Sequence, residues 1–177
     1  MSSPVAVLIG PPGAGKTTVG ALLAALLGVG YTDTDDSVEA VAGKPVADIF
    51  VEDGEPAFRA LEHEAVAAAL ASDGPEGVIG LGGGAVLDPA TRDLLDGHPV
   101  VYLETGFTEL AKRVGLDRPR PLLIGINPRA QLKTLLEQRR PVYAGLAVLT
   151  VSTDEREPAD IAAEIAALLK TAGEAGA

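Results

Sequence analysis

The chain has 177 residues, of which 47% are hydrophobic and only 3% aromatic, so we expect one domain with a core of Val, Leu, Ile and Ala side chains. It contains no cysteine, which excludes disulfides, a thiolate nucleophile and metal sites with cysteine ligands. Its formal net charge of −11 argues against a general nucleic-acid-binding protein, because such proteins carry basic surfaces.

The N-terminal residues argue against a secretory signal peptide. No basic residue precedes the first apolar run, unlike in a secretory signal peptide. The apolar stretch at residues 19–31 is too short to span a bilayer. Together with the absence of cysteine, these features predict a cytoplasmic protein without a membrane partner.

Short apolar runs alternate with helical patterns along the chain. Because buried parallel strands are short and apolar, we expect strands at residues 5–9, 30–33, 78–82, 100–104 and 148–152. Helical patterns occupy residues 17–27, 56–71, 89–95, 107–114, 130–139 and 159–170. The alternation predicts an α/β fold of three layers, a five-stranded parallel sheet with helices on both faces and ligands at the carboxyl ends of its strands. We expect residues 1–177 to form a single, monomeric domain with a disordered tail at residues 171–177.

The strongest motif is Gly10-Pro11-Pro12-Gly13-Ala14-Gly15-Lys16-Thr17, which matches the phosphate-binding pattern G-x-x-x-x-G-K-[ST]. It lies between an expected strand and an expected helix, as this pattern requires. The glycines let backbone N–H groups approach a polyphosphate. We expect Lys16 to reach the β- and γ-phosphates of ATP and Thr17 to ligate Mg²⁺. The remaining nucleotide contacts are expected from Gly13, Ala14, Gly15 and Thr18, and a chance match in a glycine-rich chain is the alternative.

Two acidic residues follow the second expected strand, in Asp33-Thr34-Asp35. Residues i and i+2 of an extended segment point the same way, so both carboxylates face the region of the phosphate loop. One could support Mg²⁺ while the other meets a substrate hydroxyl. The alternative is that they cap a helix, since further capping residues follow. The long connection after them predicts a small insertion, and we assign residues 33–62 to a substrate-binding region.

Three consecutive glycines, Gly82, Gly83 and Gly84, end the third expected strand. Many phosphate-loop proteins carry a second metal-binding acid here, but this chain has none. A metal must therefore rely on Thr17, the nucleotide, water and Asp33. The glycines permit close backbone approach to a small ring and offer N–H donors without side-chain crowding. A tight turn is the alternative, although it explains one glycine more readily than three.

Basic residues gather in one part of the chain. Eight of the fourteen Lys and Arg residues lie between Lys112 and Arg140, where only two acids oppose them, a net charge of +6. A local basic segment in an acidic protein suggests a small anionic ligand rather than a polymer. For Lys112, Arg129 and Lys133, a solvated helix face is the alternative.

Residues 115–127 hold two prolines, two arginines and no helical period, which is typical of a lid. An arginine that closes over the γ-phosphate would stabilise the charge that develops during phosphoryl transfer. Arg118 and Arg120 compete for this role.

These motifs, in this order, resemble the shikimate kinases, a family of small phosphate-loop kinases. The resemblance covers residues 5–169 and adds to the phosphate loop the motifs Asp33-Thr34-Asp35, Phe58-Arg59 with Glu62, Leu81-Gly82-Gly83-Gly84-Ala85, Arg120-Pro121-Leu122-Leu123 and Arg139-Arg140-Pro141-Val142-Tyr143. It implies transfer of a phosphoryl group from ATP, with Mg²⁺, to the 3-hydroxyl of shikimate. The family places this reaction in chorismate and aromatic amino-acid biosynthesis.

The resemblance also implies roles for single residues. Asp33 belongs to the metal shell, Asp35 binds shikimate hydroxyls and is the candidate base, and Arg120 is the lid cation. The adenine-binding residues are Arg113, Arg156 and Pro158, where arginine stacks on the base.

The resemblance further implies that Arg59 and Arg139 bind the substrate carboxylate, and that Glu62 orients Arg59. A guanidinium suits this role because it offers a carboxylate two parallel donors. Since Arg59 and Glu62 are three residues apart in a helical pattern, an exposed ion pair is the alternative for them. The neighbouring Arg140 could take the same role, so the assignment of Arg139 is ambiguous.

Two other functions stay open. A gluconate kinase or similar small-metabolite kinase would not need the glycines together with Arg59 and Arg139. A catalytically silent nucleotide-binding module would not need Lys16, Asp35 and Arg120, all of which are present.

Overall fold

The computed structural model describes residues 4–71, 76–115 and 127–175. Within these residues five parallel strands form one sheet in the order β2-β3-β1-β4-β5. The strands are β1 (Ala6–Ile9), β2 (Gly30–Asp33), β3 (Gly77–Gly80), β4 (Val100–Glu104) and β5 (Leu149–Ser152). The predicted five-stranded parallel sheet is confirmed.

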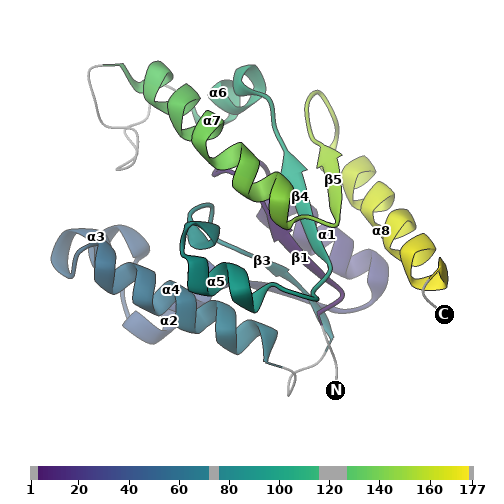
Figure 1. Cartoon of the computed structure of the whole chain (residues 1–177), viewed down its shortest axis with the longest axis horizontal. Helices are drawn as coiled ribbons and strands as arrows, with labels where there is room; N and C mark the ends of the chain where they lie inside the picture. The colour runs from purple at the N-terminus through teal and green to yellow at the C-terminus, as the bar shows by residue number, and fades with distance from the viewer. Residues whose placement is uncertain (1–3, 72–75, 116–126, 176–177) are drawn as a thin grey trace.

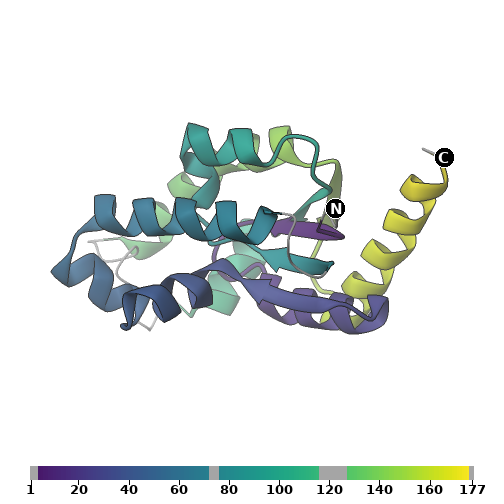
Figure 2. The same ribbon diagram turned by 90° about the horizontal axis from the view of Figure 1, so that it is seen from below.

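Helices cover both faces of the sheet (Figure 1), and the view turned by 90° shows the three layers (Figure 2). One face carries α1 (Lys16–Leu27) and α8 (Pro158–Ala175), which pack against each other. The other carries α4 (Glu55–Leu70), η1 (Ala85–Leu87), α5 (Pro89–Leu94) and α7 (Pro128–Leu146). The short helix α6 (Phe107–Val114) packs against α7.

Both layers of the core meet at the central strand β1. Ala6 and Leu8 pack toward α1 and α8, while Val7 and Ile9 pack toward α4 and α7. All four side chains are buried, because alternate residues of a strand face opposite sides of a sheet covered on both faces. The continuous apolar run in the sequence follows from this double burial.

The positions of the strands bring three motifs to one edge of the sheet. Parallel strands end at the same edge, and β2, β3 and β1 are neighbours. The phosphate loop follows β1, Asp33 ends β2, and residues 82–84 follow β3. Segments that are about 50 residues apart in the sequence therefore meet.

The predicted insertion contains two helices that the sequence pattern does not reveal, α2 (Thr34–Ala42) and α3 (Val46–Glu52). Their buried hydrophobic residues, Val38 and Ile49, pack with Phe58 of α4 in a small cluster apart from the main core. Short helices that each bury one or two residues lack the periodic apolar stripe on which a helix prediction depends.

Helix α7 is longer than predicted. The pattern predicts an end at Arg139, before Pro141, yet the helix continues to Leu146. Proline lacks an N–H donor and weakens that turn. Leu136 and Tyr143 on either side are both buried, so tertiary packing outweighs the local preference.

Helix α8 also continues further, to Ala175, so residues 171–175 are helical although a disordered tail is predicted there. The Thr171 hydroxyl donates to the Ala167 carbonyl at 3.1 Å, inside this alanine-rich helix. The prediction of a disordered tail was wrong here because alanine, which is frequent in this segment, has the highest helix propensity. No helix in the described part of the chain has both the length and the apolar character needed to cross a membrane.

Candidate active site

The phosphate loop connects β1 to the first turn of α1, as the motif predicts. Gly13 and Gly15 have φ values of 88° and 94°, in the left-handed region that residues with a Cβ rarely adopt. This loop conformation leads directly into α1, which begins at Lys16. The free N–H groups and the dipole of a helix N-terminus favour an anion, so the loop is a candidate phosphate site.

The Lys16 ammonium lies against the phosphate loop. Its Nζ donates to the carbonyl oxygens of Gly10, at 2.7 Å, and Pro11, at 3.0 Å. Burial lowers the pKa of Lys16 to about 8, and the nearby carboxylates of Asp35 and Asp33 oppose this effect only in part. An ammonium removed from water interacts strongly with anions, which suits a ligand of phosphate oxygens.

Asp33 and Thr17 bring two candidate metal ligands together. The Thr17 hydroxyl donates to Oδ2 of Asp33 at 3.1 Å, and the Tyr31 hydroxyl donates to the same oxygen at 3.3 Å. Mg²⁺ binds one or two protein oxygens together with phosphate oxygens and water, so this pair fits such a site. The described residues contain no group of three His, Cys, Asp or Glu side chains that could hold a metal, so phosphates would have to complete the shell.

Asp35 is a carboxylate with a free acceptor. Its Oδ1 is buried and accepts no hydrogen bond from any described residue. Burial raises the pKa of Asp35, and the charge of Asp33 raises it further against the opposing effect of Lys16. Such an oxygen suits a substrate hydroxyl and the proton that the hydroxyl loses. The cap of α2 is formed by Asp33, whose Oδ1 accepts from the Asp35 N–H at 2.9 Å.

The pair of Arg59 and Glu62 is partly buried, which excludes the alternative of an exposed ion pair. Nη1 of Arg59 donates to Oε2 of Glu62 at 2.6 Å, and Glu62 is only 3% exposed. Desolvation raises the pKa of Glu62, although the Arg59 guanidinium opposes this effect. The guanidinium also lies 5.3 Å from the ring centre of Phe58. Both contacts restrict the orientation of Arg59.

The glycine turn, which we define as residues 82–84, approaches other parts of the site too closely for any side chain. A Cβ on Gly82, Gly83 or Gly84 would lie within 2.7 Å of the carboxylates of Asp35 and Glu62, of the Pro12 ring, and of the Arg59 guanidinium, respectively. Each position therefore has its own steric reason to be glycine. A tight turn alone does not account for this.

Thr34 holds the glycine turn in place, a role that the sequence does not indicate. The side chain is fully buried, and its hydroxyl donates to the Gly80 carbonyl at 3.3 Å and accepts from the Gly82 N–H at 3.2 Å. A threonine between two aspartates looks like a capping residue, and nothing local identifies partners 46 and 48 residues away.

The structure separates the two adjacent arginines of α7. Arg139 is 7% exposed, and its Nη1 donates to the Gly83 carbonyl at 3.3 Å. Arg140, in contrast, is exposed. Because residues of a helix are about 100° apart, only one of two neighbours can face the sheet, and here that residue is Arg139.

Most of the predicted residues line one cavity of about 440 Å³. Its predicted members are Gly13, Gly15, Lys16, Thr17, Thr18, Asp33, Asp35, Arg59, Gly82, Gly83, Gly84 and Arg139, with Glu62 beside them. Pro12 and the apolar side chains of Val46, Phe50, Phe58 and Leu81 complete the lining, and the ring centres of Phe50 and Phe58 lie 4.5 Å apart. The sequence offers no signal for Val46 and Phe50, because they belong to the unpredicted helix α3.

The three predicted adenine-binding residues lie outside this cavity. Arg113 donates to the carbonyl oxygens of Ala14, at 3.3 Å, and Thr153, at 2.8 Å, so it joins the phosphate loop to the segment before α8. Arg156 donates to the Ser152 carbonyl at 3.0 Å in the same segment, and Pro158 begins α8. Arg113 therefore contacts the phosphate loop directly, whereas the contacts of Arg156 are to Ser152 and to Glu164 of α8.

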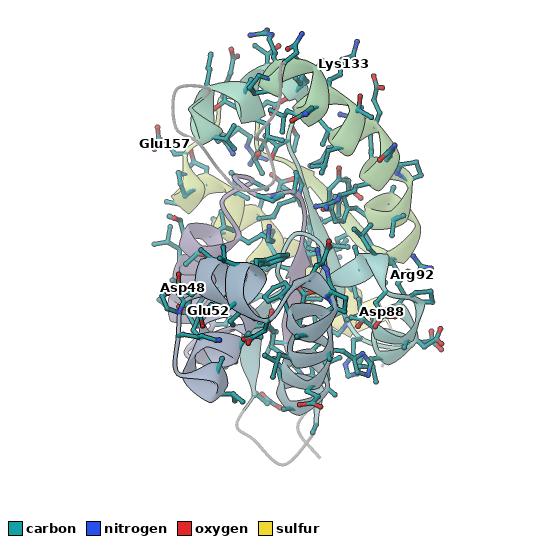
Figure 3. The ribbon with its side chains drawn as sticks, turned by 90° about the vertical axis from the view of Figure 1, so that its left-hand side faces the viewer. Asp48, Glu52, Asp88, Arg92, Lys133 and Glu157 are labelled. Carbon is teal, nitrogen blue, oxygen red and sulfur yellow. The ribbon has the colours of Figure 1, made fainter. Side chains whose placement is uncertain are left out.

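The predicted lid falls almost entirely outside the described residues. Arg118 and Arg120 both belong to residues 116–126, so the structure assigns no position to either of them. Three other basic residues of this part of the chain, Lys112, Arg129 and Lys133, are exposed, in agreement with a solvated helix face. Figure 3 shows Lys133 on the outer surface of α7.

Replacing Gly82 with alanine is expected to lower kcat/KM for the phosphoryl acceptor at least tenfold. The new Cβ must displace the Asp35 and Glu62 carboxylates, which are ends of side chains and can move at a stability cost of about 1 kcal/mol. Steady-state kinetics and thermal unfolding measure the two effects. Gly145→Ala is the control, because its Cβ meets nothing within 4 Å in α7 and should leave activity unchanged. Wild-type kcat/KM in the Gly82 variant would contradict the steric argument.

Comparisons with known proteins identify the family of this chain. A model of the shikimate kinase family matches residues 12–170. A shikimate kinase of Thermobifida fusca is 62% identical over 98% of this chain and 99% of its own length, and one of Salinispora arenicola is 60% identical over 94% and 98%. The solved structure of the Acinetobacter baumannii shikimate kinase in complex with shikimate superimposes with a TM-score of 0.88, at 35% identity over 97% of this chain and 94% of that chain.

Proposed function

The chain belongs to the shikimate kinase family, and we propose that its cavity of about 440 Å³ is where it uses ATP to phosphorylate the 3-hydroxyl of shikimate. The reaction itself follows from relatives at about 60% identity over nearly the whole chain, so neither a gluconate kinase nor a silent nucleotide-binding module describes this protein. The observation that carries the proposed location is the convergence of a carboxylate with a free acceptor, two arginines and a phosphate loop on one cavity.

Shikimate is a ring with one carboxylate and three hydroxyls, and the cavity offers a partner for each part. Arg59 and Arg139 come from opposite sides and supply the donors for the carboxylate. Phe50 and Phe58 give the ring an apolar wall. Asp35 accepts from a hydroxyl through its unpartnered oxygen. This arrangement supports a single orientation, with the carboxylate at the two arginines and a hydroxyl at Asp35.

The phosphates of ATP bind in the loop, where backbone N–H groups and Lys16 surround them. Thr17 and Asp33 would hold Mg²⁺ together with the phosphates, since their oxygens already lie 3.1 Å apart. When bound, the metal supplies positive charge that offsets the charge of the phosphates. Adenine lies toward Arg113, Arg156 and Pro158, where a guanidinium can stack on the base.

In the chemical step, the 3-hydroxyl oxygen of shikimate forms a bond to the γ-phosphorus while the bond from that phosphorus to the β,γ-bridging oxygen breaks. Asp35 accepts the hydroxyl proton, and ADP leaves with the bridging oxygen. Lys16 stabilises negative charge on the phosphoryl oxygens. Arg120 of the lid segment, rather than Arg118, supplies a further cation at the transferring group.

We also propose that the protein acts as a cytoplasmic monomer without a nucleic-acid partner. One chain supplies every described residue that lines the cavity, and the net charge of −11 opposes binding to a polyanion. Size-exclusion chromatography with light scattering should give a mass near 18.0 kDa.

The location of the substrate is tested by Arg59→Lys. Lysine keeps the positive charge but loses the two parallel donors, so we expect KM for shikimate to rise at least tenfold and KM for ATP to change less than twofold. Arg140→Lys is the matched control, because Arg140 is the exposed arginine of α7. Equal losses for both substrates would indicate a folding defect, and an unchanged KM for shikimate would reject this location.

A further inference from the structure

The glycine turn is held from two sides by buried hydroxyl groups. On the side of α2, the Thr34 hydroxyl bonds Gly80 and Gly82. On the side of α7, the Tyr143 hydroxyl donates to the Gly83 carbonyl at 2.5 Å. The first two bonds support the approach to the turn, whereas the third acts on a peptide group at its centre.

Tyr143 cannot touch a ligand in the cavity. Its side chain is fully buried and lies behind the turn, where it stacks on Tyr102 with ring centres 5.2 Å apart. Burial raises the pKa of Tyr143 to about 12, so its hydroxyl stays protonated and donates at any physiological pH. Any effect of this hydroxyl on the substrate must therefore pass through Gly83.

The bond to Gly83 determines where the next N–H group points. A trans peptide group is planar, with its C=O and N–H directed oppositely. Since the Gly83 carbonyl faces Tyr143 of α7, the Gly84 N–H points the opposite way, away from α7. The Arg59 guanidinium of the cavity lies next to the Gly84 Cα. Within the described residues, neither Gly83 nor Gly84 donates its N–H to a protein acceptor. A buried N–H without a partner is rare unless a ligand supplies one.

We propose that Tyr143 is a positioning residue for shikimate binding: by holding the Gly83 carbonyl away from the cavity, it presents the Gly84 N–H to the substrate. This inference rests on the proposed location of shikimate. Without the Tyr143 hydroxyl, only the 3.3 Å bond from Arg139 holds that carbonyl, and Arg139 is itself assigned to the substrate. The peptide group can then rotate and turn its oxygen toward the bound carboxylate, which repels it.

Tyr102 provides a matched control for this hydroxyl. Its ring lies on that of Tyr143 and is equally buried, but its own hydroxyl lies beside Arg140 and makes no bond to the glycine turn. Tyr143→Phe and Tyr102→Phe therefore remove the same atom from two stacked rings. Only the first change removes a bond to the glycine turn.

The experiment compares both variants with the wild type in steady-state kinetics. For Tyr143→Phe we expect KM for shikimate to rise about five- to tenfold, the equivalent of one neutral hydrogen bond, with kcat within twofold and KM for ATP unchanged. For Tyr102→Phe all three constants should equal those of the wild type. A residue that only packs would change the amount of active enzyme, and hence kcat, without raising one KM.

A direct measurement uses the Gly84 amide signal in ¹⁵N NMR spectra, titrated with shikimate in the presence of ADP. In the wild type the signal should move downfield as the N–H gains an acceptor, and in Tyr143→Phe the movement should shrink. An unchanged KM for shikimate in Tyr143→Phe, or an equal rise in Tyr102→Phe, would overturn the inference. If Arg59→Lys raises this KM under the same conditions, the location of shikimate stands on its own; if neither variant raises it, the location fails as well.

Discussion

Replacing Asp35 with asparagine is expected to lower kcat about a thousandfold while nucleotide binding is retained. A positioned general base contributes about 10²- to 10⁴-fold to a rate. Asparagine has nearly the same shape but cannot take the proton, and Oδ1 of Asp35 is the oxygen without a protein partner. The cap of α2 survives, because it uses the backbone N–H of this residue. Coupled assay of ADP release measures kcat, and calorimetry with ADP measures binding.

Stability provides a second readout for this variant. The pKa of Asp35 is raised, so the folded state disfavours the charged carboxylate, and at neutral pH that charge lowers the free energy of unfolding. Asparagine removes the charge, so Tm should stay equal or rise while activity falls. Asp36→Asn is the control, since Asp36 is exposed in the same helical turn and should keep full activity. A rate near that of the wild type in Asp35→Asn would contradict the role of Asp35 as general base and leave it only a place in the first turn of α2.

Replacing Lys16 with alanine is expected to lower kcat more than a hundredfold and to leave the fold intact. Loss of one preorganised donor to a transition state typically costs about 10²- to 10³-fold. Lys16 is the group whose buried ammonium lies against the phosphate loop, and its pKa of about 8 reflects how little water stabilises that charge. Its two hydrogen bonds go to loop carbonyls rather than to the core. Thermal unfolding should therefore change little.

The matched control for Lys16→Ala is Lys133→Ala. It removes the same charge from the exposed face of α7, where Lys133 pairs with Glu137 at 3.9 Å. This variant should be as active as the wild type, because exposed ion pairs contribute little. Normal turnover in Lys16→Ala would reject the assignment of the phosphate loop, whereas equal losses in both variants would point to net charge rather than position.

The strands and the phosphate loop are encoded locally, and the sequence alone predicts them. The run around β1 is apolar because both faces of that strand are buried, and the glycines of the loop are required by left-handed backbone angles. The order of motifs also identifies the family and thereby the reaction. The strands and the loop are set by neighbouring residues and the family by the order of motifs, so a linear sequence contains both.

The insertion and the ends of α7 and α8 depend on contacts that the pattern does not record. Helix α3 exists because Ile49 meets Phe58 across a small cluster, and α7 passes Pro141 because Tyr143 is anchored behind the turn. In both segments, packing against a distant element outweighs weak or unfavourable local propensity.

The chemistry of the site shows the same division. Lys16, Asp35 and the three glycines can be identified from their motifs. Their residue types already suggest that they bind a phosphate, a hydroxyl group and a small ring, respectively. The choice of Arg139 over Arg140 depends on which face α7 turns to the sheet, and the partial burial of the Arg59–Glu62 pair depends on how α4 packs. The hydroxyls of Thr34 and Tyr143 reach the glycine turn across 46 to 60 residues of chain. Hydrogen bonds between residues so far apart leave no periodic pattern in the sequence. Their partners meet only through the order and register of the strands, so the tertiary structure alone determines these bonds.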